Sequence, residues 1–263
     1  MRNVISVTEY KKIDTSKWEK ISFETFTPLG LPLLSIQFDE QGKEKEKQIV
    51  GYNPSGILIN IITYKNGKMT DTMETKQDSS GKITFAREFV YSSADGKKIP
   101  VKDTYFEYYS NGKLKKRTEL SGYPSDTNSI YYCDTSGIAT RTNWRSSPGL
   151  RTTQIDYLWN SERTEMKELH HQSDGTVYNT IVHKYKNNLE IEKIDSLTMI
   201  IPFYWKYDKK NRLIETNANV FYTLLLEYDN SGYPIHKTLK NIIYDSGEAP
   251  EKIEYKYEYK FRK

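Results

Sequence analysis

Hydrophobic and polar residues alternate with a period of two in many short stretches of this chain. The clearest stretch runs from Ile253 to Phe261, where aliphatic and aromatic residues occupy every second position and charged residues lie between them. Successive side chains of a β-strand point to opposite faces of a sheet. This stretch therefore predicts a strand with one apolar and one charged face, and the run Lys43-Glu-Lys-Glu-Lys47 indicates extended structure in the same way.

Turn signals separate these stretches at short intervals. Polar clusters that end in glycine, such as Asp78-Ser-Ser-Gly81 and Ser110-Asn-Gly112, recur every 11 to 16 residues from Gly42 onward. Asn-Gly and Asp-Gly pairs supply the positive φ angles that tight hairpin turns require. Such spacing leaves room for two strands of about five residues per unit but not for helices of ordinary length. The glycines predicted to form turns are Gly56, Gly67, Gly81, Gly96, Gly112, Gly137, Gly175 and Gly232.

An aromatic residue often ends the strand before a turn, and Asp or Asn often follows it directly. Tyr52-Asn53, Tyr207-Asp208 and Tyr228-Asp229 are examples. We expect the ring to lie on the buried face and the Asx side chain to bond the turn backbone two residues on. The chain has 22 tyrosines, which bury apolar area while their hydroxyls reach water, so the composition favours a thin sheet with one wet side.

These patterns predict an all-β fold, an antiparallel meander of tandem β-hairpin repeats that forms a curved sheet, a barrel or a solenoid-like shell. Residues 36–263 are expected to form a single repeat β-domain, because no linker rich in Gly, Ser or Pro divides them. Residues 1–35 do not follow the pattern, and the apolar residues of the stretch 10–21 are loosely spaced as in a helix. We expect residues 1–35 to be an N-terminal cap or edge segment that covers the first strand edge.

Charge and hydropathy exclude some function classes. The net charge is +4, with 39 basic and 35 acidic residues, which is too balanced to predict a nucleic-acid partner. No apolar run reaches the roughly 18 residues that cross a bilayer, so no transmembrane segment is expected. The N-terminus lacks the apolar region of a signal peptide. The protein is therefore cytoplasmic, or it is periplasmic or on the cell surface and a leader has been removed.

The histidines and the cysteine do not predict a metal site or a nucleophile. His170 and His171 are adjacent, so on a strand they point to opposite faces and cannot both bind one metal without a bulge. His183 and His236 are expected to lie on the surface like them. Cys133 is the only cysteine, so no internal disulfide can form, and no nearby histidine offers it a base.

Acidic residues and glycines likewise predict no enzyme. Four carboxylates lie in one region and could serve glycoside hydrolysis, but acidic residues alternate throughout the chain and no specific pair stands out. Every glycine cluster reads as a hairpin turn, so no phosphate-binding loop is present. We therefore predict no catalytic residues and no cofactor. The four carboxylates are Glu162, Glu165, Glu168 and Asp174.

Three tryptophans and two longer loops are the candidates for a binding site. Trp144, Trp159 and Trp205 could stack on sugar rings, but the more ordinary expectation is that they fill the sheet face like the tyrosines around them. The loops 121–129 and 145–149 are longer than the tight turns, and loops of that length carry function more often. The tryptophans and the two loops therefore stay candidates for a binding site.

Several units resemble known repeats. The stretches Tyr207–Thr216 and Tyr228–Thr238 resemble tyrosine-aspartate (YD, or RHS-type) repeats, and the stretch Tyr108–Arg117 is similar to the repeats of MORN and YwqK-like proteins. The resemblance implies a long antiparallel meander of the kind found in exported or surface bacterial proteins, where it acts as a scaffold, carrier or binding surface. YwqK-like proteins also include antitoxins. The resemblance implies no catalytic residues.

Three functions follow from these observations. The leading hypothesis is a non-catalytic bacterial β-repeat binding or scaffold protein on the cell surface or in the periplasm. The first alternative is a cytoplasmic antitoxin or immunity protein that binds a toxin partner. The second alternative is a glycan-binding or glycan-active protein. The expected partner is thus a protein or a glycan.

Overall fold

The protein is all-β, as the sequence predicts. The computed structural model describes residues 4–121, 126–144, 154–197, 202–219, 222–241 and 252–262. These residues form a 20-stranded sheet and contain no helix, so none of them belongs to a helix that could cross a membrane. The strands are β1 (Val4–Lys12), β2 (Trp18–Phe26), β3 (Pro32–Phe38), β4 (Glu44–Tyr52), β5 (Leu58–Lys65), β6 (Lys68–Gln77), β7 (Ile83–Tyr91), β8 (Lys98–Tyr108), β9 (Leu114–Ser121), β10 (Asp126–Cys133), β11 (Ala139–Trp144), β12 (Gln154–Trp159), β13 (Glu165–His171), β14 (Val177–Lys186), β15 (Leu189–Asp195), β16 (Phe203–Tyr207), β17 (Leu213–Asn219), β18 (Tyr222–Tyr228), β19 (Pro234–Asn241) and β20 (Lys252–Phe261).

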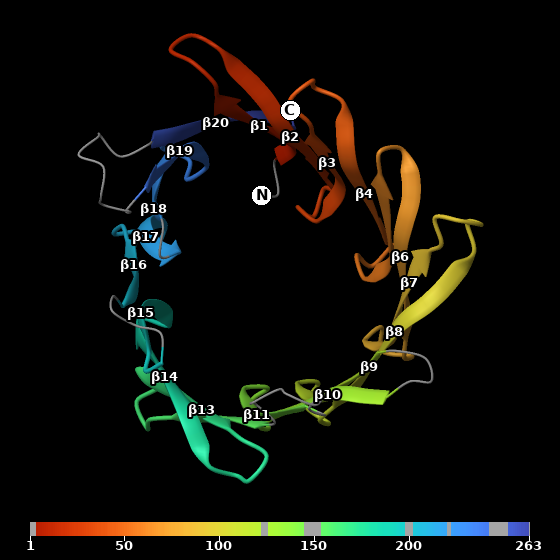
Figure 1. The fold of residues 1–263 in the computed structure, drawn as a ribbon, viewed down its shortest axis with the longest axis vertical. Helices are drawn as coiled ribbons and strands as arrows, with labels where there is room; N and C mark the ends of the chain where they lie inside the picture. Colours follow the sequence, from red (N-terminus) through yellow and green to blue (C-terminus); the bar gives the residue numbers. More distant parts are fainter. Residues whose placement is uncertain are drawn as a thin grey trace. The chain divides into compact units, whose positions relative to one another are not determined.

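Each strand pairs with the next strand along the chain, which is the topology of a meander (Figure 1). The pairing is antiparallel, for example between β4 and β5, where Val50 lies opposite Ile61. The last strand, β20, pairs with β19, and Arg262 follows directly after it. Ile253 lies opposite Leu239 of β19, and the Arg262 guanidinium donates hydrogen bonds to the carbonyl oxygens of Val4 and Phe26. The predicted meander of tandem hairpins is therefore confirmed.

The chain divides into two compact units. Unit 1 contains residues 1–130, 135–137 and 257–263, and unit 2 contains residues 131–134 and 138–256. Among the residues that the structure describes, each unit has only a few buried apolar side chains, spread over several strands, as expected for a thin sheet. They are Val4, Phe26, Ile36, Val50 and Ala86 in unit 1, and Ile155, Met166 and Ile181 in unit 2.

The N-terminal segment is part of the sheet rather than helical. β1 and β2 form a hairpin, β2 pairs with β3, and β3 runs through residue 35, where the cap was expected to end. The stretch 10–21 has apolar residues that are loosely spaced as in a helix, but its residues 10–12 and 18–21 belong to β1 and β2. A register shift between Glu9 and Tyr10 displaces the alternation of β1 relative to that of β2. Asp14 closes the turn that follows, because its carboxylate accepts hydrogen bonds from the backbone N–H groups of Ser16 and Lys17. A bulge of this kind breaks the period of two without ending the strand pair.

Many of the described turns between strands share one geometry. At Asp78 the carboxylate accepts the N–H groups of Ser80 and Lys82, and the Gly81 N–H donates to the Asp78 carbonyl oxygen. This is a type I turn followed by a left-handed residue. All eight predicted turn glycines have positive φ, between 68° and 91°. Two tighter two-residue turns, at Asn66-Gly67 and Asn187-Asn188, have positive φ at both positions, as type I′ turns require.

In unit 1 a row of aromatic rings shares one face of the sheet. Cross-strand partners lie on the same face, and the pairs Phe23–Ile36, Ile36–Lys47 and Lys47–Tyr64 place Phe23 and Tyr64 together. Lysine ammonium groups lie over these rings, 5.0 Å from the Phe23 centroid (Lys20) and 5.1 Å from the Tyr64 centroid (Lys47). The lysine stems shield the rings while their charges stay in water, so this face stays solvated without a second layer.

Candidate functional site

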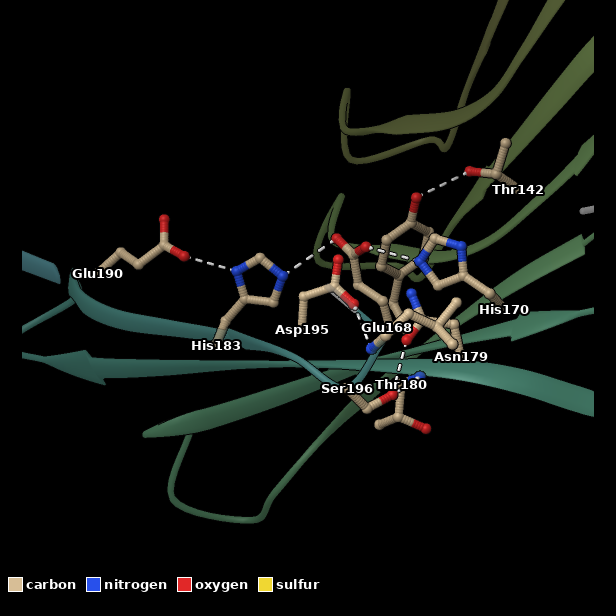
Figure 2. Close-up of polar contacts among 11 residues, drawn as sticks. Thr142, Glu168, His170, Asn179, Thr180, His183, Glu190, Asp195 and Ser196 are labelled. Carbon is tan, nitrogen blue, oxygen red and sulfur yellow. Dashed lines mark hydrogen bonds and ion pairs between the residues drawn. The ribbon is translucent and has the colours of Figure 1, made fainter. Parts of the chain in front are cut away.

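One face of unit 2 carries a cluster of four ionisable side chains, which we call the His183 cluster: Glu168, His170, His183 and Glu190. The pairing of β13 with β14 sets Met166 opposite His183 and Glu168 opposite Ile181. Because cross-strand partners share a face, Glu168 and His183 lie on the same side of the sheet. The side chains of the cluster face one another in Figure 2.

The imidazole of His183 lies between two carboxylates. His183 is only 7% exposed, its Nδ1 lies 2.5 Å from Glu190 Oε1, and its Nε2 lies 3.3 Å from Glu168 Oε1. The other oxygen of Glu168 lies 3.2 Å from His170 Nε2. The expectation that the histidines lie on the surface is therefore wrong for His183, because its ring is buried between Glu168 and Glu190.

The electrostatics of the cluster favour a charged His183. Burial by itself lowers the pKa of the His183 imidazole, but the hydrogen bonds and charges of Glu168 and Glu190 outweigh burial and raise it above its usual value. Burial likewise acts to raise the pKa of Glu168, but the contacts with His183 and His170 outweigh it and lower that pKa. Burial, helped by the charges of Glu190 and Glu168, raises the pKa of Tyr185 to about 12.

His171 belongs to the opposite face. Its Nε2 lies 3.1 Å from Asp156 Oδ2, and its Nδ1 lies 3.1 Å from the Gly175 carbonyl oxygen. A register shift follows His170, yet the two adjacent histidines still point apart. Within the part of the chain that the structure describes, no three or more His, Cys, Asp or Glu side chains are grouped to hold a metal ion.

The four carboxylates that the sequence marks in this region do separate tasks. Glu168 belongs to the His183 cluster, and Glu165 lies 3.6 Å from the Lys167 ammonium. Asp174 closes its turn, because its carboxylate accepts hydrogen bonds from the backbone N–H and the hydroxyl group of Thr176. Glu162 is exposed in the turn between β12 and β13. No two of these four carboxylates therefore face each other across a cleft, as the catalytic pair of a glycoside hydrolase would.

Next to the His183 cluster, at the turn end of β14 to β17, lies a pocket of about 560 Å³, which we call the aromatic–lysine pocket. Burial and then the charge of Glu190 raise the pKa of Tyr207, which lines the pocket, so this ring lies near the cluster. Its apolar lining is Leu189, Ile191, Trp205, Tyr207 and Ile214, and its polar lining is Lys186, Asn187, Lys206, Asp208, Lys209 and Asn211. Two other pockets in the described residues are smaller, about 270 and 280 Å³.

Two neighbouring turns build this pocket. Lys186 and Leu189 flank the Asn187-Asn188 turn, and Asp208 begins the turn that ends at Arg212. Asn211 has φ 60° at the position that glycine holds in most of the other turns. His183 lies opposite Lys193, and Lys193 lies opposite Phe203. Since Trp205 is two residues beyond Phe203 on β16, its ring lies on the same face as the His183 cluster.

Some of the charged side chains that line the pocket form ion pairs, and others do not. Lys206 Nζ lies 2.8 Å from Glu215 Oε1, and the Asp208 carboxylate lies 2.6 Å from the Arg212 guanidinium while also accepting two turn N–H groups. Lys186 and Lys209 make no ion pair with any described residue. The pocket therefore carries two exposed positive charges that no described carboxylate pairs with.

The structure separates the three candidate tryptophans. Trp205 lines the pocket, and Trp159 packs on Tyr185 with ring centroids 5.0 Å apart. Trp144 ends β11 at the opposite end of the strands from Trp159, which ends the adjacent β12. Of the three tryptophans, Trp205 is thus the one that lines a pocket among those formed by described residues. Of the two candidate loops, residues 122–125 and 145–149 lie outside the described residues.

Comparison with known proteins finds likeness only among solved structures. No family model matches the chain, and no curated protein matches it. The chain is similar to a porin-like protein from Bacteroides uniformis ATCC 8492, with 11% sequence identity and a TM-score of 0.43 over 98% of this chain and 96% of that chain. It is also similar to a protein with unknown function from Bacteroides fragilis NCTC 9343, with 15% identity and a TM-score of 0.24 over 49% of this chain and 93% of that chain.

Proposed function

We propose that this protein is a non-catalytic binding protein and that its aromatic–lysine pocket binds a carbohydrate. The observation that carries the proposal is the position of Trp205 in a pocket whose polar lining includes Asn187 and Asn211. A flat aromatic ring stacks on the apolar face of a sugar, and carboxamides both donate to and accept from hydroxyl groups. The pocket volume lies within the range of about 300–1,000 Å³ that is usual for small-molecule sites.

Binding is better supported than hydrolysis. Glycoside hydrolases need two carboxylic groups that flank the scissile bond, one of them free to give a proton. The single carboxylate that lines the pocket, Asp208, is held by the turn backbone and by Arg212. Glu168 and Glu190 both contact His183. No described carboxylate is thus positioned as a free acid or base at the pocket.

The test is calorimetric titration of the whole protein with a panel of neutral and acidic oligosaccharides. We expect at least one to bind, and we expect Trp205→Leu to weaken that binding by about fivefold or more, since stacking of a flat ring on an aromatic side chain contributes about 1–3 kcal/mol. Trp144→Leu is the matched control and should leave the affinity unchanged. Failure of the whole panel to bind, or equal effects of the two substitutions, would contradict the proposal.

We also propose that the protein works on the bacterial cell surface or in the periplasm, because polymeric glycans are found in those compartments. Fractionation of the source cells, followed by immunoblotting of cytoplasmic, periplasmic and envelope fractions, tests this location. Recovery of the protein in the cytoplasmic fraction alone would favour the antitoxin hypothesis and contradict an extracytoplasmic role.

A further inference from the structure

We infer that the ligand of the aromatic–lysine pocket is an acidic carbohydrate that carries a carboxylate, such as a hexuronic acid residue. This inference rests on the proposed function and goes beyond it by naming the charge of the ligand. It concerns Lys186 and Lys209, which line the pocket beside Trp205.

The first step in the argument is the charge of the lining. Three lysines and one carboxylate line the pocket. Lys206 is matched by Glu215, and Asp208 is matched by Arg212. The ammonium groups of Lys186 and Lys209 remain without an ionic partner among the described residues. Both lysines are exposed and hydrated, so an anion in the pocket would add an ion pair that a neutral sugar cannot form.

The second step is the placement of the two lysines. Lys186 ends β14 just before the Asn187-Asn188 turn, and Lys209 belongs to the turn that follows β16. The two charges therefore come from two different turns that border one cavity. A lysine ammonium is a compact donor that binds a carboxylate without a fixed fork geometry. A ligand in the cavity could thus direct its carboxylate to either turn.

The third step concerns the remaining polar groups. Asn187 and Asn211 both have positive φ, of 53° and 60°, and both line the pocket. Their amides carry no charge and suit the hydroxyl groups of the same ring. The pocket thus offers an aromatic surface, two amides and two free ammonium groups, and an acidic sugar has the complementary group for each.

The experiment compares acidic oligosaccharides with their methyl esters, which keep the rings and hydroxyls but lose the charge. Trimers of galacturonate, mannuronate and glucuronate are titrated into the whole protein. We expect at least one acid to bind about tenfold or more tightly than its ester, and its affinity to fall with added NaCl. Lys186→Gln and Lys209→Gln should each weaken binding of the acid by about three- to tenfold and leave the ester unaffected.

Lys210→Gln is the matched control, because Lys210 is in the same turn as Lys209 and is equally exposed but does not line the pocket. It should not change the affinity for the acid. If an ester binds as tightly as its acid and depends on Trp205, the inference about charge is overturned while the proposed carbohydrate binding stands. If neither acids, esters nor neutral oligosaccharides bind, the proposed function fails as well.

Discussion

The hydroxyl group of Tyr108 donates a hydrogen bond to the backbone carbonyl oxygen of Ile83 over 2.8 Å. Tyr108 is the last residue of β8, and Ile83 is the first residue of β7 after the preceding turn at the same end of the strands. Tyr228 makes the same contact with Leu213, the first residue of β17, over 2.7 Å. The aromatic residue before a turn therefore ties that turn to the previous one, a role beyond the burial that its position in the sequence predicts.

Replacement of Tyr108 by Phe tests the strength of this link. The Phe variant keeps the ring but removes the donor, so we expect the free energy of unfolding to fall by about 0.5–1.5 kcal/mol. Burial, followed by the charge of Asp78, raises the pKa of Tyr108, so the hydroxyl stays protonated well above neutral pH. Urea unfolding followed by circular dichroism measures the change. Tyr105→Phe on the same strand is the control, because its side chain is 42% exposed, and an equal loss in both variants would refute the link.

The second prediction concerns His183 and pH. Its folded-state pKa is raised above the usual value of 6.5. The group therefore stabilises the fold fully below about pH 6.5, and this contribution is lost as the pH rises through the folded-state pKa. The pKa of Glu168 is lowered from 4.5, so its contribution is present above about pH 4.5 and is lost as the pH falls through its folded-state value. The cluster should stabilise the fold most between these limits.

We therefore expect His183→Gln to lower the free energy of unfolding by about 1–3 kcal/mol at pH 5.5–6.5. The difference from the wild-type protein should shrink as the pH rises above 6.5 and through the folded-state pKa. Denaturant unfolding at a series of pH values measures it. His236→Gln, which removes an exposed imidazole on β19, controls for the loss of a histidine as such. A difference that grows above pH 6.5 would show that the assigned sign is wrong.

The third prediction compares two cross-strand ion pairs of unit 1. Arg87 and Asp103 lie opposite each other on β7 and β8 and form two hydrogen bonds of 2.6 Å, with Asp103 only 15% exposed. Lys116 and Glu107 also lie opposite each other but form one contact of 3.2 Å, and Glu107 is 51% exposed. A bidentate and better-buried pair is stronger than a single exposed one.

Double-mutant cycles with alanine measure the two coupling energies. We expect about 1 kcal/mol for Arg87 with Asp103 and at most about 0.5 kcal/mol for Lys116 with Glu107. Added salt should reduce the second value more than the first, because exposed charges are screened more strongly. Equal coupling energies would mean that the geometry of the Arg87 fork adds nothing to the stability of the sheet.

The strands and turns were predictable because their causes are local. Asp78 and Gly81 are three residues apart, and the carboxylate and the positive φ that close the turn are properties of those residues alone. The same local rules fail where the phase of alternation changes. The shift between Glu9 and Tyr10 made strands look loosely helical, because a bulge changes which residues share a face.

The candidate site was predictable only in part because its parts meet through strand register. Trp205 was a candidate, but nothing near it in the sequence distinguishes it from Trp144 and Trp159. The distinction arises when the turn at Asn187 and the turn that contains Asn211 come side by side across β15 and β16. Pairs of asparagines at turn positions usually held by glycine are the signal that could have marked this edge, since Asn tolerates positive φ and adds a polar group.

Asn211 gives the last prediction, which separates stability from binding at one residue. Its φ of 60° is a conformation that glycine adopts without strain, so Asn211→Gly should change the free energy of unfolding by less than about 0.5 kcal/mol. Asn211→Ala keeps the strain and loses the amide, and it should cost about 1–2 kcal/mol.

Because Asn211 also lines the aromatic–lysine pocket, both variants should weaken binding of the acidic oligosaccharide by about three- to tenfold, the loss expected for one hydrogen bond. Thermal melting and calorimetric titration of the same preparations measure the two properties. Normal binding by a stable Asn211→Gly variant would show that asparagine serves only the turn. Weak binding by that variant would mean that its amide belongs to the site.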